Sequence, residues 1–237
     1  MRGISRETRC EMSKKINIMG ICLDNYSVRE SLMRLDTYMS STVLNIIETV
    51  TMEQLILAGE NPAIKECLEQ ADLCIIGERE ILTETGTDSA QRVREVCGQE
   101  FLHELLGRAE RSRKRIFLLA ETDVEIEYMK ETFGGLSAKF TAAGCYAAET
   151  CGGDLDAIVN EINGATPDVV ISALASPMEE EFVLSHKDKV GAGIWYGIGS
   201  SYDLKKKKVG RTIKKLFLKG RLRHFVSKYE SENKDRI

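Results

Sequence analysis

The sequence predicts an α/β fold: a Rossmann-like, mostly parallel sheet flanked by helices, with a basic helical C-terminal appendage. Short apolar runs, each of the length of a buried strand, alternate with segments in which apolar residues recur at helical spacing. Strands that alternate with helices pair in parallel through crossover helices, which cover both faces of the sheet. Only three prolines interrupt the pattern, and Pro167 and Pro177 bracket one of the expected strands.

The expected elements follow in chain order. Ser27 and Glu30 form the capping signature of a helix start, and apolar residues then recur at helical spacing as far as Met39. Apolar runs predict strands over residues 43–47, 73–76, 116–119, 169–174 and 193–198. Helical periodicity predicts helices over residues 51–70, 98–109, 122–133, 154–163 and 177–187.

The length of 237 residues allows one full core with an appendage. We divide the chain into a polar N-terminal extension (1–15), an α/β core (16–204) and a basic amphipathic appendage (205–237). The extension lacks the apolar stretch of a signal peptide, and no apolar run approaches the roughly 18 residues of a spanning helix. The seven cysteines form no Cys-x-x-Cys pair beside a histidine and fit a reducing compartment. The sequence therefore predicts a cytoplasmic protein.

Positive charge is concentrated near the C-terminus, although the net charge is −4. Eleven of the 33 basic residues lie between Lys205 and Lys228, and no acidic residue lies among them. Interleaved apolar residues predict one or two short basic amphipathic helices, broken near Gly220. Such a segment indicates an anionic partner: lipid, phosphate or nucleic acid. The nucleic-acid alternative is disfavoured, because the chain has no aromatic stacking platform and no recognised nucleic-acid module.

Two strand ends that are close in the sequence predict a shared ligand site. Small residues and then Glu179 and Glu180 follow one apolar run, and a stretch of small residues ending in Asp203 follows the next. In α/β proteins, ligands bind at the carboxyl ends of parallel strands. We therefore expect one pocket there, lined by Thr49, Glu78, Pro177, Glu180 and Asp203.

These segments resemble the WecG/TagA/CpsF family of bacterial glycosyltransferases. Residues 173–182 read Ala-Leu-Ala-Ser-Pro-Met-Glu-Glu-Glu-Phe, and the family pattern is Ala-Leu-Gly-x-Pro-x-Gln-Glu-x-Trp/Phe. Residues 197–203 read Gly-Ile-Gly-Ser-Ser-Tyr-Asp, against Gly-x-Gly-Gly-x-Phe-Asp, and Arg211 stands where the family has a further arginine. The resemblance runs from about Asn17 to Arg211.

The resemblance implies transfer of an N-acetylhexosamine, such as N-acetylmannosamine, from a UDP-sugar to a polyprenyl-diphosphate-linked sugar in cell-wall, capsule or exopolysaccharide biosynthesis. It implies no metal and no cofactor, because Arg211, Arg221 and Arg223 would neutralise the leaving diphosphate. It also implies a peripheral position at the inner face of the cell membrane, where the basic segment meets anionic lipid, and it is compatible with a homo-oligomer.

Thr49 and Glu78 are the candidate catalytic residues. Thr49 matches an active-site threonine of the family, and Glu78 lies one residue from the position of the family's proposed base, an aspartate that is Gly77 here. A carboxylate at a strand end beside an anionic donor could acquire the raised pKa of a general base. The residues alone also allow plainer interpretations, in which Thr49 merely ends a strand and Glu78 belongs to a solvated turn.

The candidate donor-binding residues follow the same motifs. Gly98 and Glu100 match a Gly-x-Asp segment that would approach a phosphate at a helix start, although Gly98 equally suits a helix cap. Glu179 and Glu180 stand for a Gln-Glu pair implicated in nucleotide binding; the alternative is an acidic first turn of a helix with Pro177 at its first position. Thr51 also belongs to the set, with the alternative role of a helix N-cap. The candidate donor-binding residues are Thr51, Gly98, Glu100, Pro177, Glu179, Glu180, Gly197, Gly199, Tyr202, Asp203, Arg211, Arg221 and Arg223.

A second hypothesis is a catalytically inactive relative that binds a nucleotide sugar or a partner protein. Replacement of the proposed base by Gly77 and of the motif glutamine by Glu179 favours it. Other classes are disfavoured. The three histidines are scattered, with no acid or cysteine at ligand spacing, and no Gly-x-Gly-x-x-Gly or Walker motif follows the first strand.

Overall fold

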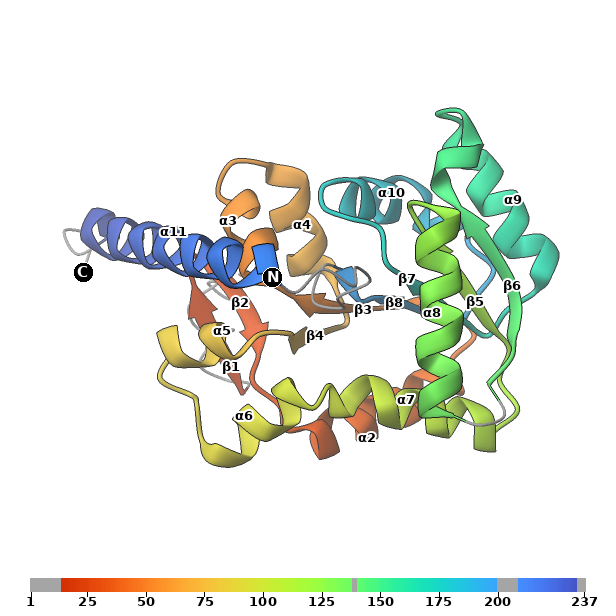
Figure 1. Cartoon of the computed structure of the whole chain (residues 1–237), viewed down its shortest axis with the longest axis horizontal. Coiled ribbons are helices and arrows are strands. Elements are labelled where there is room, and N and C mark those ends of the chain that lie inside the picture. Colours follow the sequence, from red (N-terminus) through yellow and green to blue (C-terminus); the bar gives the residue numbers. More distant parts are fainter. Residues whose placement is uncertain (1–13, 138–139, 200–208, 234–237) are drawn as a thin grey trace, which may run out of the picture.

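A six-stranded parallel sheet forms the centre of the molecule (Figure 1). The computed structural model describes residues 14–137, 140–199 and 209–233, and in the last segment it describes the side chains of residues 218–232. The strands, in spatial order, are β4 (Leu73–Ile76), β3 (Asn45–Val50), β8 (Ile194–Gly197), β7 (Val169–Ser172), β5 (Ile116–Ala120) and β6 (Ala142–Ala147). Every neighbouring pair is parallel. The predicted α/β, Rossmann-like fold is confirmed.

Helices cover both faces of this sheet (Figure 1). One face carries α2 (Val28–Tyr38), α7 (Glu100–Arg111) and α8 (Asp123–Leu136), and the other carries α4 (Pro62–Gln70), α9 (Leu155–Ala165) and α10 (Met178–His186). Val169 and Ile171 point into the first core and Val170 points into the second. Because both faces are buried, these strands read as continuous apolar runs, which is why the sequence revealed them.

Local capping sets several helix boundaries. Ser27 and Glu30 form a complete capping box at the start of α2, as predicted. The helix expected over residues 51–70 is instead two helices, α3 (Met52–Ala58) and α4. Asn61 caps α4 and Pro62 opens it. Proline cannot continue a helix interior but suits its first position, so the second helix begins there.

Several elements escape sequence reasoning. A two-stranded antiparallel hairpin joins β1 (Lys15–Ile18) and β2 (Ile21–Asp24), and edge strand β6 consists mostly of small residues that make no apolar run. The remaining short elements are α5 (Arg79–Glu84), α6 (Ala90–Cys97) and two 3-10 turns, η1 (Ala148–Cys151) and η2 (Lys187–Lys189). Short elements of this kind carry too few periods to stand out from loops.

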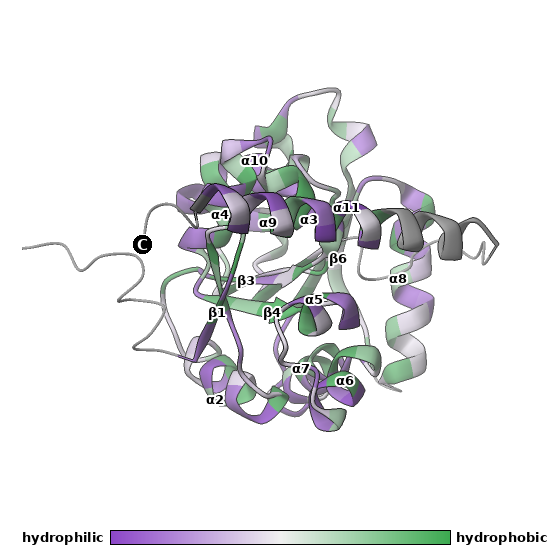
Figure 2. Cartoon of the chain, turned by 90° about the vertical axis from the view of Figure 1, so that its left-hand side faces the viewer, coloured by the Kyte–Doolittle hydropathy of each residue, from purple (hydrophilic) through white to green (hydrophobic). Residues whose placement is uncertain are grey.

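The C-terminal segment is one continuous helix, α11 (Val209–Asn233), so the predicted break near Gly220 is wrong. Glycine in a helix interior costs about 1 kcal/mol relative to alanine. Packing against α3 outweighs that cost, because Leu222 is fully buried and Leu218 and Phe225 pack in the same apolar cluster. Figure 2 shows α11 lying across this side of the molecule. Within the described residues, no helix is both long and apolar enough to cross a membrane.

Candidate functional site

Two cavities flank the carboxyl end of β3, and Thr49 lines both of them. The Tyr196 cavity measures about 40 Å³, and its lining includes Tyr26, Thr49, Gly77, Arg92, Glu95 and Tyr196. The Glu48 cavity measures about 200 Å³, and its lining includes Glu48, Thr49, Thr51, Glu53, Glu179 and Gly199. A third cavity, of about 790 Å³, lies by Asp72, Asp168 and Gly193 near the opposite ends of the strands and contains none of the candidate residues.

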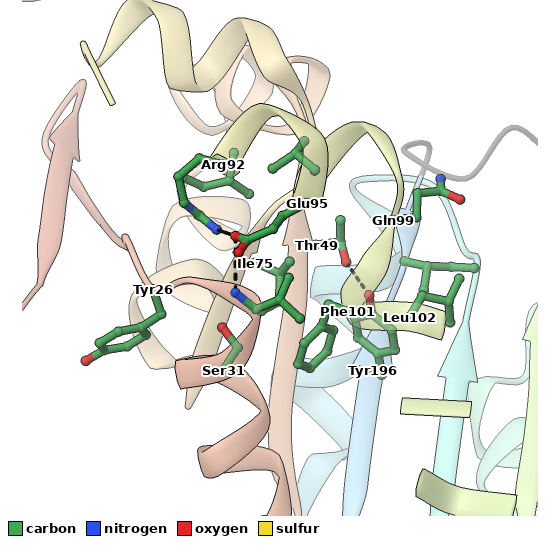
Figure 3. Close-up of a pocket in the computed structure, with 15 residues that line it drawn as sticks. Tyr26, Ser31, Thr49, Ile75, Arg92, Glu95, Gln99, Phe101, Leu102 and Tyr196 are labelled. Carbon is green, nitrogen blue, oxygen red and sulfur yellow. Dashed lines mark hydrogen bonds and ion pairs between the residues drawn. The ribbon is translucent and has the colours of Figure 1, made fainter. Parts of the chain in front are cut away.

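The Tyr196 cavity lies on the face covered by α2 and α7 (Figure 3). The Thr49 hydroxyl donates to the Tyr196 hydroxyl at 2.9 Å. The rings of Phe101 and Tyr196 pack nearly perpendicular to each other, with 5.5 Å between their centroids. Strand β3 neighbours β8 in the sheet, so the two hydroxyls, from residues 147 positions apart, meet at one end of adjacent strands. Thr49 is thus a strand-end residue and also part of a polar pair inside a cavity.

An ion pair forms another side of the Tyr196 cavity. Arg92 Nη1 lies 2.8 Å from Glu95 Oε2, and the backbone N–H of Val28 donates to the same oxygen at 3.2 Å. Burial by itself would raise the pKa of Glu95, but hydrogen bonds from Gln91, Arg92 and Val28 outweigh burial and lower that pKa. Glu95 is therefore a carboxylate whose hydrogen bonds hold Arg92 at the cavity.

Glu78 lies just after β4 but lines neither cavity at the carboxyl end of β3. Its Oε2 accepts a hydrogen bond of 2.6 Å from the backbone N–H of Met52, the first residue of α3. Gly77, at the position of the family's aspartate, does line the Tyr196 cavity. The contact with α3 gives Glu78 a structural role, and its catalytic role stays a prediction.

The Glu48 cavity lies on the other face, between the sheet and α10. Glu179 Oε1 accepts from Trp195 Nε1 at 2.6 Å, and its Oε2 accepts from the Ser172 hydroxyl at 2.5 Å. Glu180 Oε1 accepts from Gln54 Nε2 at 2.7 Å and from the Ser176 hydroxyl at 2.6 Å. These bonds attach the first turn of α10 to β7, β8 and α3, so Glu179 and Glu180 of that acidic turn are buried, whereas Glu181 is exposed.

Burial dominates the electrostatics of these carboxyl groups. It raises the pKa of Glu179 to about 8, against the hydrogen bonds from Ser172 and Trp195, which lower it. Burial, followed by the neighbouring carboxylates of Glu179 and Glu180, also raises the pKa of Glu48 well above its usual value. Within the described ranges, no cluster of three histidine, cysteine or acidic side chains has the arrangement of a metal site.

The remaining candidates have mixed placements. Thr51 caps α3 by accepting from the N–H of Gln54, and Gly98 is the C-cap of α6, so in both cases the capping alternative describes the local structure. Glu100 is the first residue of α7. Pro177 is the N-cap of α10 and not its first residue, because the helix begins only at Met178.

The expected lining of the pocket is partly wrong. Thr49 and Glu180 do lie at the same end of the sheet, since Gln54 of α3 joins the two regions. However, Glu78, Pro177 and Glu180 are not among the lining residues of either cavity. Glu180 is instead turned toward Gln54 and Ser176, whose hydrogen bonds hold it behind the wall of the Glu48 cavity.

The glycines and arginines of the candidate set complete the inventory. Gly197 ends β8, and Gly199 has φ +50°, in the left-handed region that favours glycine. Arg221 pairs with Glu60 at 3.5 Å and Arg223 pairs with Glu84 at 2.6 Å. Tyr202, Asp203 and the side chain of Arg211 lie outside the described residues.

Sequence reasoning missed Glu48, Gln54, Arg92, Glu95 and Tyr196. A signal existed for Glu48, which is a charged residue at the end of an apolar run that reads as a buried strand. Such a residue is either paired or functional. No comparable signal marked Arg92 or Glu95, because a helix rich in charge usually has a solvated face.

The chain matches a known family over most of its length. Residues 16–214 match the glycosyl transferase WecG/TagA/CpsF family. An N-acetylglucosaminyldiphosphoundecaprenol N-acetyl-beta-D-mannosaminyltransferase of Bacillus spizizenii is 26% identical over 178 residues, which cover 71% of this chain and 65% of the relative. A protein of the same name from Staphylococcus aureus strain NCTC 8325 is 21% identical over 192 residues, covering 80% of this chain and 75% of the relative.

The chain thus spans about two thirds of the length of its Bacillus relative. Both relatives are named as transferases of an N-acetyl-beta-D-mannosaminyl group. With the family match extending from β1 into α11, and the matched motifs meeting at one end of the sheet, this chain belongs to the WecG/TagA/CpsF family of glycosyl transferases.

Proposed function

We propose that this protein transfers an N-acetylhexosamine, of the N-acetylmannosamine type, from a UDP-sugar to a sugar linked to polyprenyl diphosphate. The observation that carries the proposal is the family match over residues 16–214, together with two cavities that meet at Thr49. The names of the relatives, which specify an N-acetylmannosaminyl group and an undecaprenyl-diphosphate-linked acceptor, support the choice of substrates.

In the reaction, a hydroxyl group of the acceptor sugar attacks the anomeric carbon of the donor, its proton passes to a base, and UDP leaves with the bonding electrons. The Thr49 hydroxyl donates to Tyr196, so its lone pairs remain available to a donor group of the substrate. Glu78 is the predicted base. The Glu48 cavity would hold the hydroxyl-rich part of a substrate, because carboxylate oxygens accept from hydroxyl groups.

We propose that no metal or cofactor takes part and that basic side chains neutralise the leaving diphosphate. Arg211 and the lysines close to it in the sequence are candidates for neutralising the diphosphate. Arg221 and Arg223 would have to exchange their partners Glu60 and Glu84 for phosphate oxygens. Arg221 and Glu60 are both substantially exposed, and exposed pairs contribute at most about 1 kcal/mol, so this exchange is inexpensive. In the second pair Arg223 is exposed but the Glu84 side chain is only 13% exposed, so its exchange costs more.

We further propose that the protein works at the membrane surface, where a polyprenyl chain resides. The apolar residues Leu222 and Phe225 pack against α3 and are not free to insert into lipid. The attraction is therefore electrostatic and comes from the eleven basic residues between Lys205 and Lys228. Each basic residue near anionic lipid contributes about 1 kcal/mol, which salt screens.

The test is a transfer assay. The purified full-length chain is incubated with a panel of UDP-sugars and a synthetic polyprenyl-diphosphate-linked N-acetylglucosamine, and release of UDP and the mass of the product are measured. We expect one UDP-N-acetylhexosamine to give a disaccharide product. Absence of transfer and of binding with every donor would reject the proposal.

A further inference from the structure

The wall of the Glu48 cavity contains carboxyl groups that form no ion pair with a basic side chain of the described residues. Glu48 and Glu179 are 2% exposed and Glu180 is fully buried. None of the ion pairs between described residues includes any of the three. Burying even one unpaired carboxylate costs several kcal/mol, and neighbouring carboxylates repel one another, so a proton must neutralise part of this charge.

Two of these groups meet at Gly197. A methyl group added to Gly197 would lie 2.4 Å from Glu48 Oε2 and 2.9 Å from Glu179 Oε1. The two oxygens are therefore no farther apart than the sum of those distances. Glu48 and Glu179 come from β3 and α10, which are far apart in the sequence, and only a glycine at the end of β8 leaves room for both.

Their hydrogen bonds differ in a way that matters for binding. Both oxygens of Glu179 already accept, from Trp195 and from Ser172. Glu48 Oε1 is buried and has no hydrogen-bond partner within residues 14–137 and 140–199, and Glu48 lines the cavity. An unsatisfied buried oxygen costs about 1–3 kcal/mol, which a ligand with a suitable hydrogen-bonding group would recover.

We propose that Glu48 and Glu179 share one proton and that this pair binds a hydroxyl group of the substrate's sugar in the Glu48 cavity. A carboxyl–carboxylate pair with one proton offers a donor and an acceptor together, which matches the donor and acceptor of a hydroxyl group. The inference rests on the proposed function and assigns to it a binding residue, Glu48, and a dependence on pH.

The other titratable groups around the pair do not replace this proton. On α10, Glu180 is held by Gln54 and Ser176. On α4, burial and then the carboxylates of Glu48, Glu180 and Glu179 raise the pKa of Cys67, which keeps it a neutral thiol. On β4, burial and then the carboxylates of Asp24 and Glu48 raise the pKa of Cys74, which is also a neutral thiol. On α3, Glu53 lines the same cavity and adds a further acid and no cation. Glu180 Oε2, like Glu48 Oε1, is buried without a hydrogen-bond partner among the described residues, but Glu48 and Glu179 are the two carboxyl groups that converge on Gly197, so we assign the proton to that pair.

The pair gives substrate binding a defined pH dependence. Burial holds the pKa of Glu179 at about 8 and raises the pKa of Glu48 well above its usual value, so the pair carries at least one proton at neutral pH and loses protons as the pH rises above about 8. If binding requires the proton, affinity falls about tenfold for each pH unit above about 8. A glutamine at position 179 supplies a donor without a titratable proton, so Glu179→Gln should bind with an affinity that does not change over this range.

The experiment has two measurements on the full-length chain and on the variants Glu48→Gln, Glu179→Gln and Glu181→Gln. NMR titration of ¹³C-labelled glutamate carboxyl groups measures, without any ligand, the pH at which the pair loses its proton. Calorimetry with UDP-N-acetylglucosamine and UDP-N-acetylmannosamine, between about pH 6 and about pH 9, reports its effect on binding. Glu181 is the matched control because it is the next carboxylate of α10 and is exposed.

We expect two carboxyl signals to titrate together above neutral pH, and one to vanish in each of Glu48→Gln and Glu179→Gln. We also expect the fall in affinity to occur in the wild type and in Glu181→Gln and to be absent in Glu179→Gln. Titration of both carboxyls in the ordinary acidic range overturns the shared proton. Affinity that is independent of pH in the wild type overturns the role in binding. If neither sugar nucleotide binds at any pH, the proposed function fails and the role in binding fails with it, whereas the NMR titration still decides the shared proton.

Discussion

Replacing Gly197 by alanine perturbs the pair of carboxyl groups at its closest point. The new methyl carbon would lie 2.4 Å from Glu48 Oε2 and 2.9 Å from Glu179 Oε1, both closer than carbon–oxygen contacts allow. Neither side chain can retreat easily, because both are almost fully buried and Glu179 is held by Trp195 and Ser172. Overpacking of this kind costs about 1–3 kcal/mol, and we expect Gly197→Ala to lose that much unfolding free energy.

Urea denaturation of the wild type and Gly197→Ala measures this loss, and calorimetry with the UDP-sugar panel measures the accompanying loss of binding. Gly220→Ala in α11 is the control. It is also a glycine-to-alanine change, but nothing lies within 4 Å of the added methyl group, so it should stabilise the chain by about 0.5–1 kcal/mol. If Gly197→Ala unfolds at the wild-type urea concentration and binds donors equally well, the convergence of Glu48 and Glu179 on Gly197 is refuted.

The remaining predictions concern catalysis, pH and the membrane. Thr49→Val removes the buried hydrogen bond from the Thr49 hydroxyl to the Tyr196 hydroxyl, and we expect it to lose about 1 kcal/mol of unfolding free energy, measured in urea; an unchanged midpoint would contradict this. Glu78→Gln keeps an oxygen for the Met52 N–H and should fold normally, yet lower the transfer rate by about two to four orders of magnitude if Glu78 is the base; a wild-type rate would exclude it. Because burial raises the pKa of Glu179 to about 8, the contribution of Glu179 to the free energy of unfolding is fully present below about pH 4.5 and is lost as the pH rises through about 8. Urea midpoints of the wild type should therefore fall over that pH range more than those of Glu179→Gln. Co-sedimentation with anionic vesicles should occur at low salt and disappear at high salt, and replacement of the four lysines at 205–208 by glutamine should weaken it; an absence of binding at low salt would reject the membrane proposal.

The basic residues of the C-terminal segment can be tested by replacement but not by truncation, because α11 packs on the core. Removal of everything after Asp203 would delete the basic residues together with the apolar side chains of α11. Leu222 is fully buried with α3 residues, so such a truncation would expose part of the apolar cluster. Charge replacement isolates the electrostatic contribution without that side effect.

The sequence by itself determined the alternation of strands and helices, since strands buried on both faces must be apolar runs and helices that cover them must be amphipathic. It also determined the starts of α2 and α3, because Ser27 and Thr51 cap by contacts within three residues. These properties depend on residues close together in the chain, and spacing alone reports them.

Tertiary structure alone decided which side chains share a site. Glu48 faces Glu179 because β8 lies next to β3 and because α10 crosses the same face of the sheet, and neither fact is local. Pairing of Thr49 with Tyr196 depends on the same strand order. The order of the strands brings residues more than 100 positions apart into contact. The alternation of side chains along each strand decides which face of the sheet each side chain lies on. A site made of such contacts therefore exists only once the sheet has assembled.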